Sequence, residues 1–552
     1  MNYNESLSQM SLFGFGHQSH LSMPYFPSES QLYDFSQDFE IGYKTIYDPI
    51  HGNMTFPKIM WDIIDTPQFQ RLRNLKQLST SHFIYMGNNH TRFEHCLGTG
   101  FLSRDLVTRC FNTISKNEKT GEMDKKEINY LKQCVSIAGL CHDIGHGPFS
   151  HAFDIIIDNL GLEGQWDHEE FGGKIIKYLI DENKIEEIDN DMLKKINSLI
   201  EGSNLNKNTE YKWIYQIVAN KENSIDVDKF DYIQRDIYHS GVKTLSVDYQ
   251  RIFGDINIID DNICFSEKTD MSLHSLFEAR YCLHNKIYNH PDSICIESMV
   301  KDALLLSNDY FQFQEAIKSP EKFIKLDDNI LDIMLTFSLD PDEEINSNKK
   351  LLEAEKIIKR IYNRELYTII GEIPIPLGRN EKPSLEEFLS NENPNDEFHL
   401  GEKDVELRKK NINFGFKNKN PFETIYFYNP KMPNKCFKKS MEHLLSMPQV
   451  FSESTILVFC KDNKKNERAR NLFEIYKNKL FKKWNISHET NINIVNRAES
   501  PKEKNNIFMG NEFKFDKNEN KNLETPRFGG DDLLKIKRGR TKDKKVKEFK
   551  IN

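Results

Sequence analysis

A helical run that leads into a cluster of histidines and carboxylates sets the strongest limit on how this chain of 552 residues can fold. Apolar residues recur at helical spacing through Leu131, Val135, Ala138 and Cys141, which predicts a helix with one buried face. Residues 140–154 follow, and these fifteen positions carry three histidines and two aspartates. We therefore expect a buried helix to deliver this polar cluster.

The end of that helix is a candidate metal site. Consecutive helical residues point about 100° apart, so His142 and Asp143 can share one ion only where the backbone is irregular. Gly145, Gly147 and Pro148 predict such a break. Imidazole beside carboxylate suits a divalent metal. An isolated His-Asp pair is nevertheless more often a core histidine next to a helix-terminal aspartate, so the rest of the chain has to decide.

Composition and cysteine usage exclude several classes of protein. No apolar run approaches the roughly 18 residues that a membrane span needs, and the N-terminus lacks the basic and apolar regions of a secretory signal. The nine cysteines are scattered without a Cys-x-x-Cys pair, which is typical of reduced thiols in an intracellular protein, nuclear or cytosolic. The net charge of -9 argues against a nucleic-acid binder that uses its whole surface.

The composition also changes along the chain. We expect a disordered arm at residues 1–38, a helical domain at 39–330, a smaller α+β lobe at 331–497 and a disordered basic tail at 498–552. Residues 535–547 hold eight basic side chains and one acid. That segment could be a nuclear localisation or nucleic-acid patch, although a solvated tail explains it equally well.

The periodicity predicts a mainly α fold with short β-hairpins. Helices are expected at residues 59–64, 69–78, 89–107, 125–143, 168–180, 191–201 and 211–220, and another from Asp226. A hairpin is expected at 256–259 and 263–265, and strands at 424–428 and 455–460. The polar residues of the 69–78 helix, Arg71 included, have a solvated face as their simplest interpretation. For the acidic residues at the start of the helix from Asp226, the simplest interpretation is that they cap the helix.

Two imidazoles and two carboxylates occur in the order His95, His142, Asp143 and Asp228. Such a set suits a divalent metal, Fe, Zn or Mn, and leaves positions for water and phosphate oxygens. The surrounding residues form five motifs: Asp-Pro-Ile-His-Gly, Asp-Thr-Pro-Gln-Phe-Gln-Arg-Leu-Arg, Arg-Phe-Glu-His, Leu-Cys-His-Asp-Ile-Gly-His-Gly-Pro-Phe-Ser-His and Ile-Asp-Val-Asp-Lys-Phe-Asp-Tyr. Through them, residues 43 to about 480 resemble the HD-domain phosphohydrolases, and within these the SAM- and HD-domain-containing deoxynucleoside triphosphate (dNTP) triphosphohydrolases.

The resemblance implies a fold, an activity and a set of residues. The fold is an HD-domain helical core with a small C-terminal lobe, and the activity is metal-dependent hydrolysis of dNTPs to deoxynucleoside and inorganic triphosphate. The metal, Zn, Fe, Mn or Mg, is implied on His95, His142, Asp143 and Asp228. Catalytic roles are implied for His146, His151, Asp154 and His168. Substrate contacts are implied for Gln77, Leu78, Arg92, Lys229, Tyr232, Asp236, Arg280, His284 and Tyr288.

Regulation is also implied by the resemblance, through nucleotides bound between subunits of a homotetramer. Lys44, Asp65, Gln70, Arg73 and Arg364 match a site for GTP or dGTP. Tyr85, Arg251, Lys268 and His290 match a second site, which takes a dNTP activator. The sequence departs from the family at Tyr47, Ser266, Pro291 and Thr368, the last three replacing cations, so we expect weaker activation.

Two further expectations complete the sequence interpretation. The 38-residue arm is too short for a SAM domain, so we expect that domain to be missing. A nucleic-acid-binding or nuclease-like HD protein is the alternative from another class, and the complete set of expected ligands and the paired His151 and Asp154 favour the triphosphohydrolase.

Overall fold

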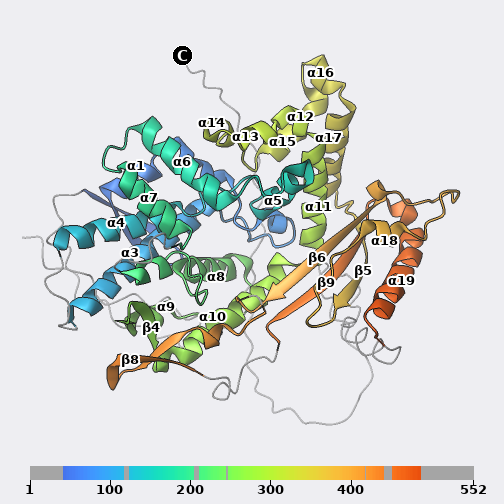
Figure 1. Cartoon of the computed structure of the whole chain (residues 1–552). Helices are drawn as coiled ribbons and strands as arrows, with labels where there is room; N and C mark the ends of the chain where they lie inside the picture. Colours follow the sequence, from blue (N-terminus) through green and yellow to red (C-terminus); the bar gives the residue numbers. More distant parts are fainter. Residues whose placement is uncertain are drawn as a thin grey trace, which may run out of the picture. The chain divides into compact units, whose positions relative to one another are not determined.

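The computed structural model describes residues 42–116, 124–203, 211–243, 246–416, 418–439 and 450–486 (Figure 1). The predicted arm at 1–38, the predicted tail at 498–552 and its basic segment lie outside these residues. Among the described elements, helices predominate and the sheets are small, which confirms the predicted fold class. No described helix is long and apolar enough to cross a membrane.

The first described elements are a hairpin and two short helices. Strand β1 (Tyr43–Asp48) pairs antiparallel with β2 (Gly52–Pro57). The turn between them is closed by the Asp48 side chain, which accepts two backbone N–H groups at 2.9 Å. Helices α1 (Lys58–Ile64) and α2 (Pro67–Gln70) follow directly, so the chain enters the helical part without a long linker.

Three long helices hold the polar cluster: α3 (Arg92–Lys116), α4 (Lys125–Cys141) and α8 (Val227–Ser240). Helix α3 packs against both α4 and α8. The approach of α3 and α4 is close, because a Cβ added at Gly139 would lie 1.9 Å from the Ser103 hydroxyl oxygen. Helices α3 and α8 carry His95 and Asp228, and α4 ends directly before His142 and Asp143, so the packing of the three helices decides whether the predicted metal set can assemble.

Further helices pack around these three. Helix α7 contacts α4, α10 contacts α8, and α11 contacts α5 and α17. Their bounds are α5 (His151–Ile157), α6 (His168–Asn183), α7 (Asn190–Ile200), α9 (Tyr249–Gly254), α10 (Asp270–Leu283), α11 (Pro291–Leu306), α12 (Asn308–Phe311), α13 (Phe313–Ala316), α14 (Pro320–Phe323), α15 (Ile330–Met334), α16 (Glu343–Asn346) and α17 (Lys349–Tyr362). Two π-helical turns, Asp158–Leu162 and His284–Tyr288, extend α5 and α10.

The strands form two further sheets. One has the order β3 (Ile256–Ile259), β4 (Asn262–Ser266), β7 (Tyr426–Asn429) and β8 (Met432–Lys438). Strand β4 pairs parallel with β7, whereas the other pairs are antiparallel. The predicted hairpin near residue 260 is therefore confirmed, and a strand from beyond residue 420 joins it.

The other sheet has the order β5 (Thr368–Ile375), β9 (Ser452–Cys460) and β6 (Val405–Asn413), with antiparallel pairs. Helices α18 (Leu385–Leu389) and α19 (Asn466–Lys483) lie beside it (Figure 1). Helix α19 packs against β5, β9 and α18. This sheet and its two helices make up a small α+β part of the chain with its own apolar cluster.

Two predicted helices were wrong. Residues 69–78 hold the end of α2 and a 3₁₀ turn, Arg71–Asn74, after which the chain is extended at Leu75. The reason lies in the tertiary structure. Lys76 forms a β-bridge with Thr91, so the backbone here pairs with another segment instead of forming helical hydrogen bonds. Residues 211–220 hold only a 3₁₀ helix, Lys212–Gln216. It begins directly after Tyr211, whose backbone is in the left-handed conformation.

Several other predictions agree with the structure after small shifts of their ends. The short helix at α1, the long helices α4, α6 and α7, and the helix that Asp226 begins are all present. Asp226 caps α8, since its carboxylate accepts from the Lys229 amide at 3.2 Å. The helix expected to begin at residue 89 begins instead at Arg92 and extends to Lys116.

Candidate active site

The polar cluster lies where α4 ends. The helix stops at Cys141, and the next residues form tight turns in which the Ile144 amide donates to Cys141 O and the His146 amide to Asp143 O. A side chain at Gly145 would collide with the carbonyl oxygen of His168, because an added Cβ would lie 2.0 Å from it. The expected break in the helix is therefore present, and it turns His142 and Asp143 toward α3 and α8.

Four donor atoms converge at this break. The Nε2 atom of His95 lies 3.2 Å from Nε2 of His142, 3.5 Å from a carboxylate oxygen of Asp143 and 3.1 Å from one of Asp228. His142 lies 3.4 Å and 3.5 Å from the same two aspartates. Ligands about 2.0–2.2 Å from one ion stand roughly 3 Å apart. His95, His142 and Asp143 offer ligand atoms within 4.8 Å of one another, and Asp228 lies within 3.5 Å of both histidines, so the four residues can surround a single divalent cation.

The two histidines are fixed from behind in a way that supports this fit. Nδ1 of His95 lies 2.7 Å from Asp231 Oδ2, and Nδ1 of His142 lies 2.9 Å from Gly139 O. Each ring can therefore keep a proton on Nδ1 and leave Nε2 to face a cation at the centre. Metal-bound histidines usually have this arrangement.

Asp231 belongs to a buried network that sequence reasoning missed. Besides His95, its carboxylate contacts His51 Nε2 at 2.6 Å and Arg235 at 2.8–2.9 Å. Arg235 in turn donates to Asp48 at 2.8 Å, which ties the first hairpin to the site. Burial opposes the charge of Asp231, but Arg235 holds the pKa of that carboxyl well below its usual range. The spacing of Asp228 and Asp231, three residues apart on one helix, was the available signal.

Against burial, the surrounding carboxylates raise the pKa of His95 to about 10 and also raise that of His142, so a bound cation would take the place of protons on both rings. Burial opposes the charge of Asp228, yet hydrogen bonds with His142 and His95 keep its pKa far below its usual range. Asp143 is likewise held ionised against burial, first of all by Arg92. Two charged carboxylates thus face two imidazoles, with one guanidinium on the rim.

A second group of histidines lies beside the first. His151 at the start of α5 has Nδ1 3.2 Å from Asp154 Oδ2, and His168 at the start of α6 has Nδ1 3.8 Å from the same oxygen. The ring of His146 stacks on that of His168 with centroids 4.3 Å apart. The exposed fraction of the His151 side chain is 74%, so its ring can reach a bound molecule.

His146 links the two groups. Its Nε2 lies 3.2 Å from Asp143, while its buried Nδ1 has no hydrogen-bond partner among the described residues. Burial and the nearby Arg92 hold the pKa of His146 well below its usual range, so the ring is neutral. A neutral, buried ring between the two groups can accept or donate one further hydrogen bond.

Cationic residues surround the two groups, as expected for phosphate contacts. Arg92 donates to Asp143 and, at 2.9 Å, to the Ser150 hydroxyl. The ammonium group of Lys229 lies 3.1 Å from Asp226, and a guanidinium nitrogen of Arg280 donates to Asn413 O at 2.9 Å. Among the described atoms, Nε of Arg280 is buried without a partner, so a donor remains available there.

Tyr232 and His284 complete this set. The Tyr232 ring lies edge-on to His95, with centroids 6.5 Å apart. Burial, followed by the charges of Arg280 and Lys229, lowers the pKa of His284 far below its usual range. Tyr232 thus lies next to the expected metal ligand His95, and His284 lies near the cations Arg280 and Lys229.

Other residues of the expected substrate set, which the resemblance places at the deoxyribose, are Gln77, Leu78 and Tyr288. The Tyr288 hydroxyl donates to one oxygen of Asp236, and the other oxygen lies 2.6 Å from His90 Nε2. The Gln77 amide donates to His90 O at 3.0 Å. The buried Oε1 of Gln77 has no partner in the described part of the chain. Leu78, next in sequence, packs half-buried against the same core.

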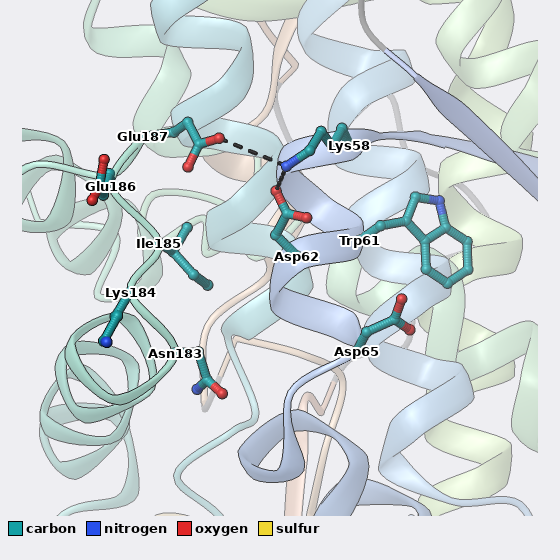
Figure 2. A pocket seen from close by; sticks show the side chains of 9 residues that line it. All are labelled: Lys58, Trp61, Asp62, Asp65, Asn183, Lys184, Ile185, Glu186 and Glu187. Carbon is teal, nitrogen blue, oxygen red and sulfur yellow. Dashed lines mark hydrogen bonds and ion pairs between the residues drawn. The ribbon is translucent and has the colours of Figure 1, made fainter.

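Four of the five residues expected to bind a guanine nucleotide lie near the end of α1. Lys44 pairs with Asp65 at 3.0 Å, and Arg73 donates to the Gln70 side chain at 2.7 Å. Asp65 also lines an open pocket of about 700 Å³ between α1 and the end of α6 (Figure 2). The opposite wall is residues 183–187, none of which was predicted.

The residues of the second expected nucleotide site form two pairs. Tyr85 lies edge-on to His290 with centroids 5.9 Å apart, and Arg251 donates to Lys268 O at 3.3 Å. Arg364, the fifth residue expected at the guanine nucleotide, donates to Phe83 O.

The substituted positions have structural uses of their own. Ser266 is fully buried and caps a short turn, Pro291 begins α11, and Thr368 bonds Asn463 at 2.7 Å. Tyr47 is 68% exposed.

Comparison with known proteins defines the class first. A family model described as the HD domain matches residues 92–236, the range that holds all four converging donors. The protein is therefore an HD-domain protein.

Whole-chain relatives define the family. The deoxynucleoside triphosphate triphosphohydrolase SAMHD1 homolog of Dictyostelium discoideum is 36% identical over 466 residues, covering 83% of this chain and 85% of that protein. SAMHD1 of Gallus gallus is 35% identical, with 76% and 72% covered, and SAMHD1 of Homo sapiens is 33% identical, with 78% and 72% covered. The chain belongs to the SAMHD1 family, which confirms the resemblance drawn from its motifs.

Proposed function

We propose that this protein hydrolyses dNTPs to a deoxynucleoside and inorganic triphosphate, with a divalent cation, Fe, Zn, Mn or Mg, bound by His95, His142, Asp143 and Asp228. The observation that carries the proposal is that the two imidazoles lie 3.1–3.5 Å from each other and from both carboxylates, beside a separate histidine–carboxylate pair. The names of the relatives support the substrate class.

The proposed chemistry divides the work between the two groups. When bound, the cation lowers the pKa of a water molecule and offsets phosphate charge. Cleavage at the α-phosphorus expels the 5′-oxygen of the nucleoside, which needs a proton. His151 is the proposed general acid, and Asp154 orients its ring through the 3.2 Å contact. His168 contacts the same carboxylate and supports that orientation.

The triphosphate would be held by the surrounding cations. Arg92, Lys229 and Arg280 supply positive charge, and the free Nε of Arg280 offers a donor that no described protein atom uses. Arginine suits two-point contact with phosphate, whereas lysine acts as a point charge. Tyr232 and His284 would border this site, and neutral His146 would line its inner side.

The deoxyribose would lie against Gln77, Leu78 and Tyr288. The unpartnered Oε1 of Gln77 is an acceptor for a sugar hydroxyl. Asp236 is held by His90 and Tyr288, so its position is fixed before a ligand arrives. Leu78 and the Tyr288 ring would crowd the 2′ position and exclude ribonucleotides.

We also propose that bound nucleotides regulate the enzyme. A guanine nucleotide at Lys44, Asp65, Gln70, Arg73 and Arg364, and a dNTP at Tyr85, Arg251, Lys268 and His290, would promote a homotetramer. Asp65 can accept from guanine N1–H and the 2-amino group. The function would be dNTP pool control inside the cell, nuclear or cytosolic, and the nine free cysteines support a reducing compartment. We further propose that domain boundaries lie at residues 38, 330 and 497, between the arm, the helical domain, the α+β lobe and the tail.

One assay tests the proposed function. Purified full-length protein is incubated at pH 8 with each dNTP and a divalent metal, with and without GTP, and the products are separated by chromatography. Deoxynucleoside and triphosphate should appear in equal amounts. Release of pyrophosphate or of single phosphates would contradict cleavage at the α-phosphorus, and no consumption of any dNTP would contradict the activity.

A further inference from the structure

A short segment between α14 and α15 contacts both sides of the candidate active site. Leu326 O accepts from Arg71 Nε at 2.8 Å, and the Nη2 atom of the same arginine donates to His146 O at 2.9 Å. The Asp328 amide donates to Asn74 O at 3.1 Å. Arg71 is buried, so the solvated position that its sequence context suggested is wrong. These contacts join residues 71–74 to the loop that carries His146.

The Asp328 carboxylate makes the most specific of these contacts. Its Oδ2 accepts from the Lys76 amide at 2.8 Å, and its Oδ1 accepts from the Phe149 amide at 2.7 Å. Lys76 directly precedes Gln77, the proposed sugar contact. Phe149 lies two residues before His151, the proposed acid. One carboxylate therefore joins the backbones next to the two ends of the proposed substrate site.

The loop at Phe149 needs such a support. Phe149 has φ +60° and Ser150 has φ +57°, and side-chain-bearing residues adopt this region only when their surroundings enforce it. The Ser150 hydroxyl donates to Lys76 O at 3.0 Å and accepts from Arg92 at 2.9 Å. The Asp328 and Ser150 bonds therefore fix the strained pair from both sides.

From this geometry we propose that Asp328 is a positioning residue, which holds the sugar-side backbone and the general-acid loop at a fixed separation. The inference rests on the proposed function for the roles of Gln77 and His151. It does not require Asp328 to touch substrate or metal.

A helix cap is the simplest alternative, and the contacts argue against it. The residue that makes the turn before α15 is Asp327, whose Oδ1 accepts from the Asn329 amide at 3.0 Å. Both oxygens of Asp328 are used elsewhere, by residues 76 and 149, which lie 252 and 179 positions away in sequence. Asp328 thus joins the backbones of two distant segments, whereas Asp327 serves its own turn and accepts from one distant side chain, that of Asn74.

The chemistry of the carboxylate suggests a sharp variant. Two backbone N–H groups need two acceptor oxygens, and an ionised carboxylate offers both. Asp328→Asn has nearly the same shape, but its amide has only one oxygen and turns an NH₂ group toward the other donor. Asp327→Asn is the matched control, since the neighbouring carboxylate bonds only the Asn74 side chain and its own turn among the described residues.

The kinetic test uses full-length enzyme loaded with metal at pH 8, where Asp328 is charged. Asp328→Asn should lower kcat by roughly 10–100-fold, the order expected when reacting groups are misplaced by about 1 Å. KM should stay within about threefold, because the phosphate-binding cations are untouched, and metal content should be unchanged. Asp327→Asn should behave as wild type. An Asp328→Asn enzyme with wild-type kcat overturns the proposal.

A second measurement separates this inference from the proposed function. Hydrogen–deuterium exchange on substrate-free protein should show faster exchange for Asp328→Asn in peptides that contain Lys76 and Phe149, and unchanged exchange in α17 and α19. Unchanged exchange at both amides overturns the positioning role even if kcat falls. Loss of protection throughout the chain, or failure to fold, assigns Asp328 to general stability and also overturns it. A wild-type enzyme inactive on every dNTP would refute the proposed function, while the exchange result would still decide whether Asp328 holds both segments.

Discussion

The side chain of His142 contributes one donor to the converging four and nothing to the apolar core. His142→Ala should therefore abolish stoichiometric metal binding and dNTP turnover while leaving the helical content unchanged. Elemental analysis of the purified protein measures the metal, and circular dichroism checks the fold. His399→Ala, which alters a half-exposed histidine in the small α+β part, is the control. Full metal occupancy in His142→Ala would contradict the ligand assignment.

The proposed acid can be separated from metal binding. His151→Ala should keep metal and substrate affinity but lose turnover by roughly 10²–10⁴-fold, the usual contribution of general acid–base catalysis. Steady-state kinetics and elemental analysis on the same preparation provide the measurement. Turnover near the wild-type rate would place the acid elsewhere, and His168, which shares the Asp154 oxygen, would be the next residue to test.

Asp328 should also change how stability depends on pH. Burial raises its pKa to about 7, although two backbone amides and Arg71 act in the opposite direction and Asp327 acts in the same one. The unfolded value is about 3.9, so the folded state holds an extra proton between these pH values. The stability that this proton contributes is fully present below about pH 4 and is lost as pH rises through about 7.

The pH dependence can be measured by comparing wild type with Asp328→Asn. Because Asp328→Asn cannot titrate, the free energy of unfolding of wild type minus that of the variant should fall as pH rises from 5 to 8. Urea unfolding of both proteins at several pH values measures the difference. A difference that stays constant over this range would show that the carboxyl does not have a raised pKa in the folded state.

The π-helical turn at the end of α10 sets the position of the proposed sugar wall. It turns Tyr288 toward Asp236, and the bond to Asp236 fixes the ring. Tyr288→Ala should lower dNTP turnover and narrow the dNTP-to-rNTP ratio by about 10-fold or more, since removing a steric wall admits the larger sugar. Tyr288→Phe keeps the wall and should keep most of the ratio. Competing hydrolysis of dGTP and GTP measures it, and an unchanged ratio in Tyr288→Ala would place discrimination elsewhere.

The elements that sequence could predict are those with their own periodicity. Helices α4, α6 and α7 each carry a regular apolar face, and α8 carries its cap in Asp226. The region after α2 shows the same apolar spacing, but pairing between Lys76 and Thr91 overrides it. Local pattern cannot reveal this, because the partner lies in another segment.

The assembly of subunits is where the proposed switch would act. GTP should shift the protein from monomer or dimer to a larger oligomer and raise dNTP turnover, because a ligand that binds only the assembled form favours it by mass action. Asp65→Ala should remove the response, whereas Asp62→Ala, one turn earlier and paired with Lys58, should keep it. Sedimentation velocity with and without GTP measures the shift. Indifference of both oligomer and rate to GTP and dGTP would contradict the switch.

The response should also be weak and sensitive to salt. The resemblance places Ser266, Pro291 and Thr368 at positions of cations, so we expect fewer charges to bridge the activator phosphates. Raising the ionic strength should therefore abolish GTP-driven assembly at lower salt than it affects catalysis. The same sedimentation series at increasing salt checks this.

The chain as a whole shows which site residues a sequence can disclose. His95, His142, Asp143 and Asp228 were predicted because each stands in a motif with a chemical reason for its residue type, and the structure brings them together. Asp231, Asp328 and Arg71 were missed as functional residues. Their partners lie up to 255 positions away in sequence, so only the packed chain reveals what they hold.

Gly98 lies one turn after His95 on α3, and its lack of a side chain leaves room for Asp231. A Cβ at this position would lie 1.8 Å from Asp231 Oδ1 and 2.7 Å from an Arg235 nitrogen, so any other residue would push the carboxylate off the His95 ring. A homologue could thus retain all four ligand residues and still be a pseudoenzyme. Screens of genomes for active members of the family should therefore require glycine at this position as strictly as they require the ligands themselves.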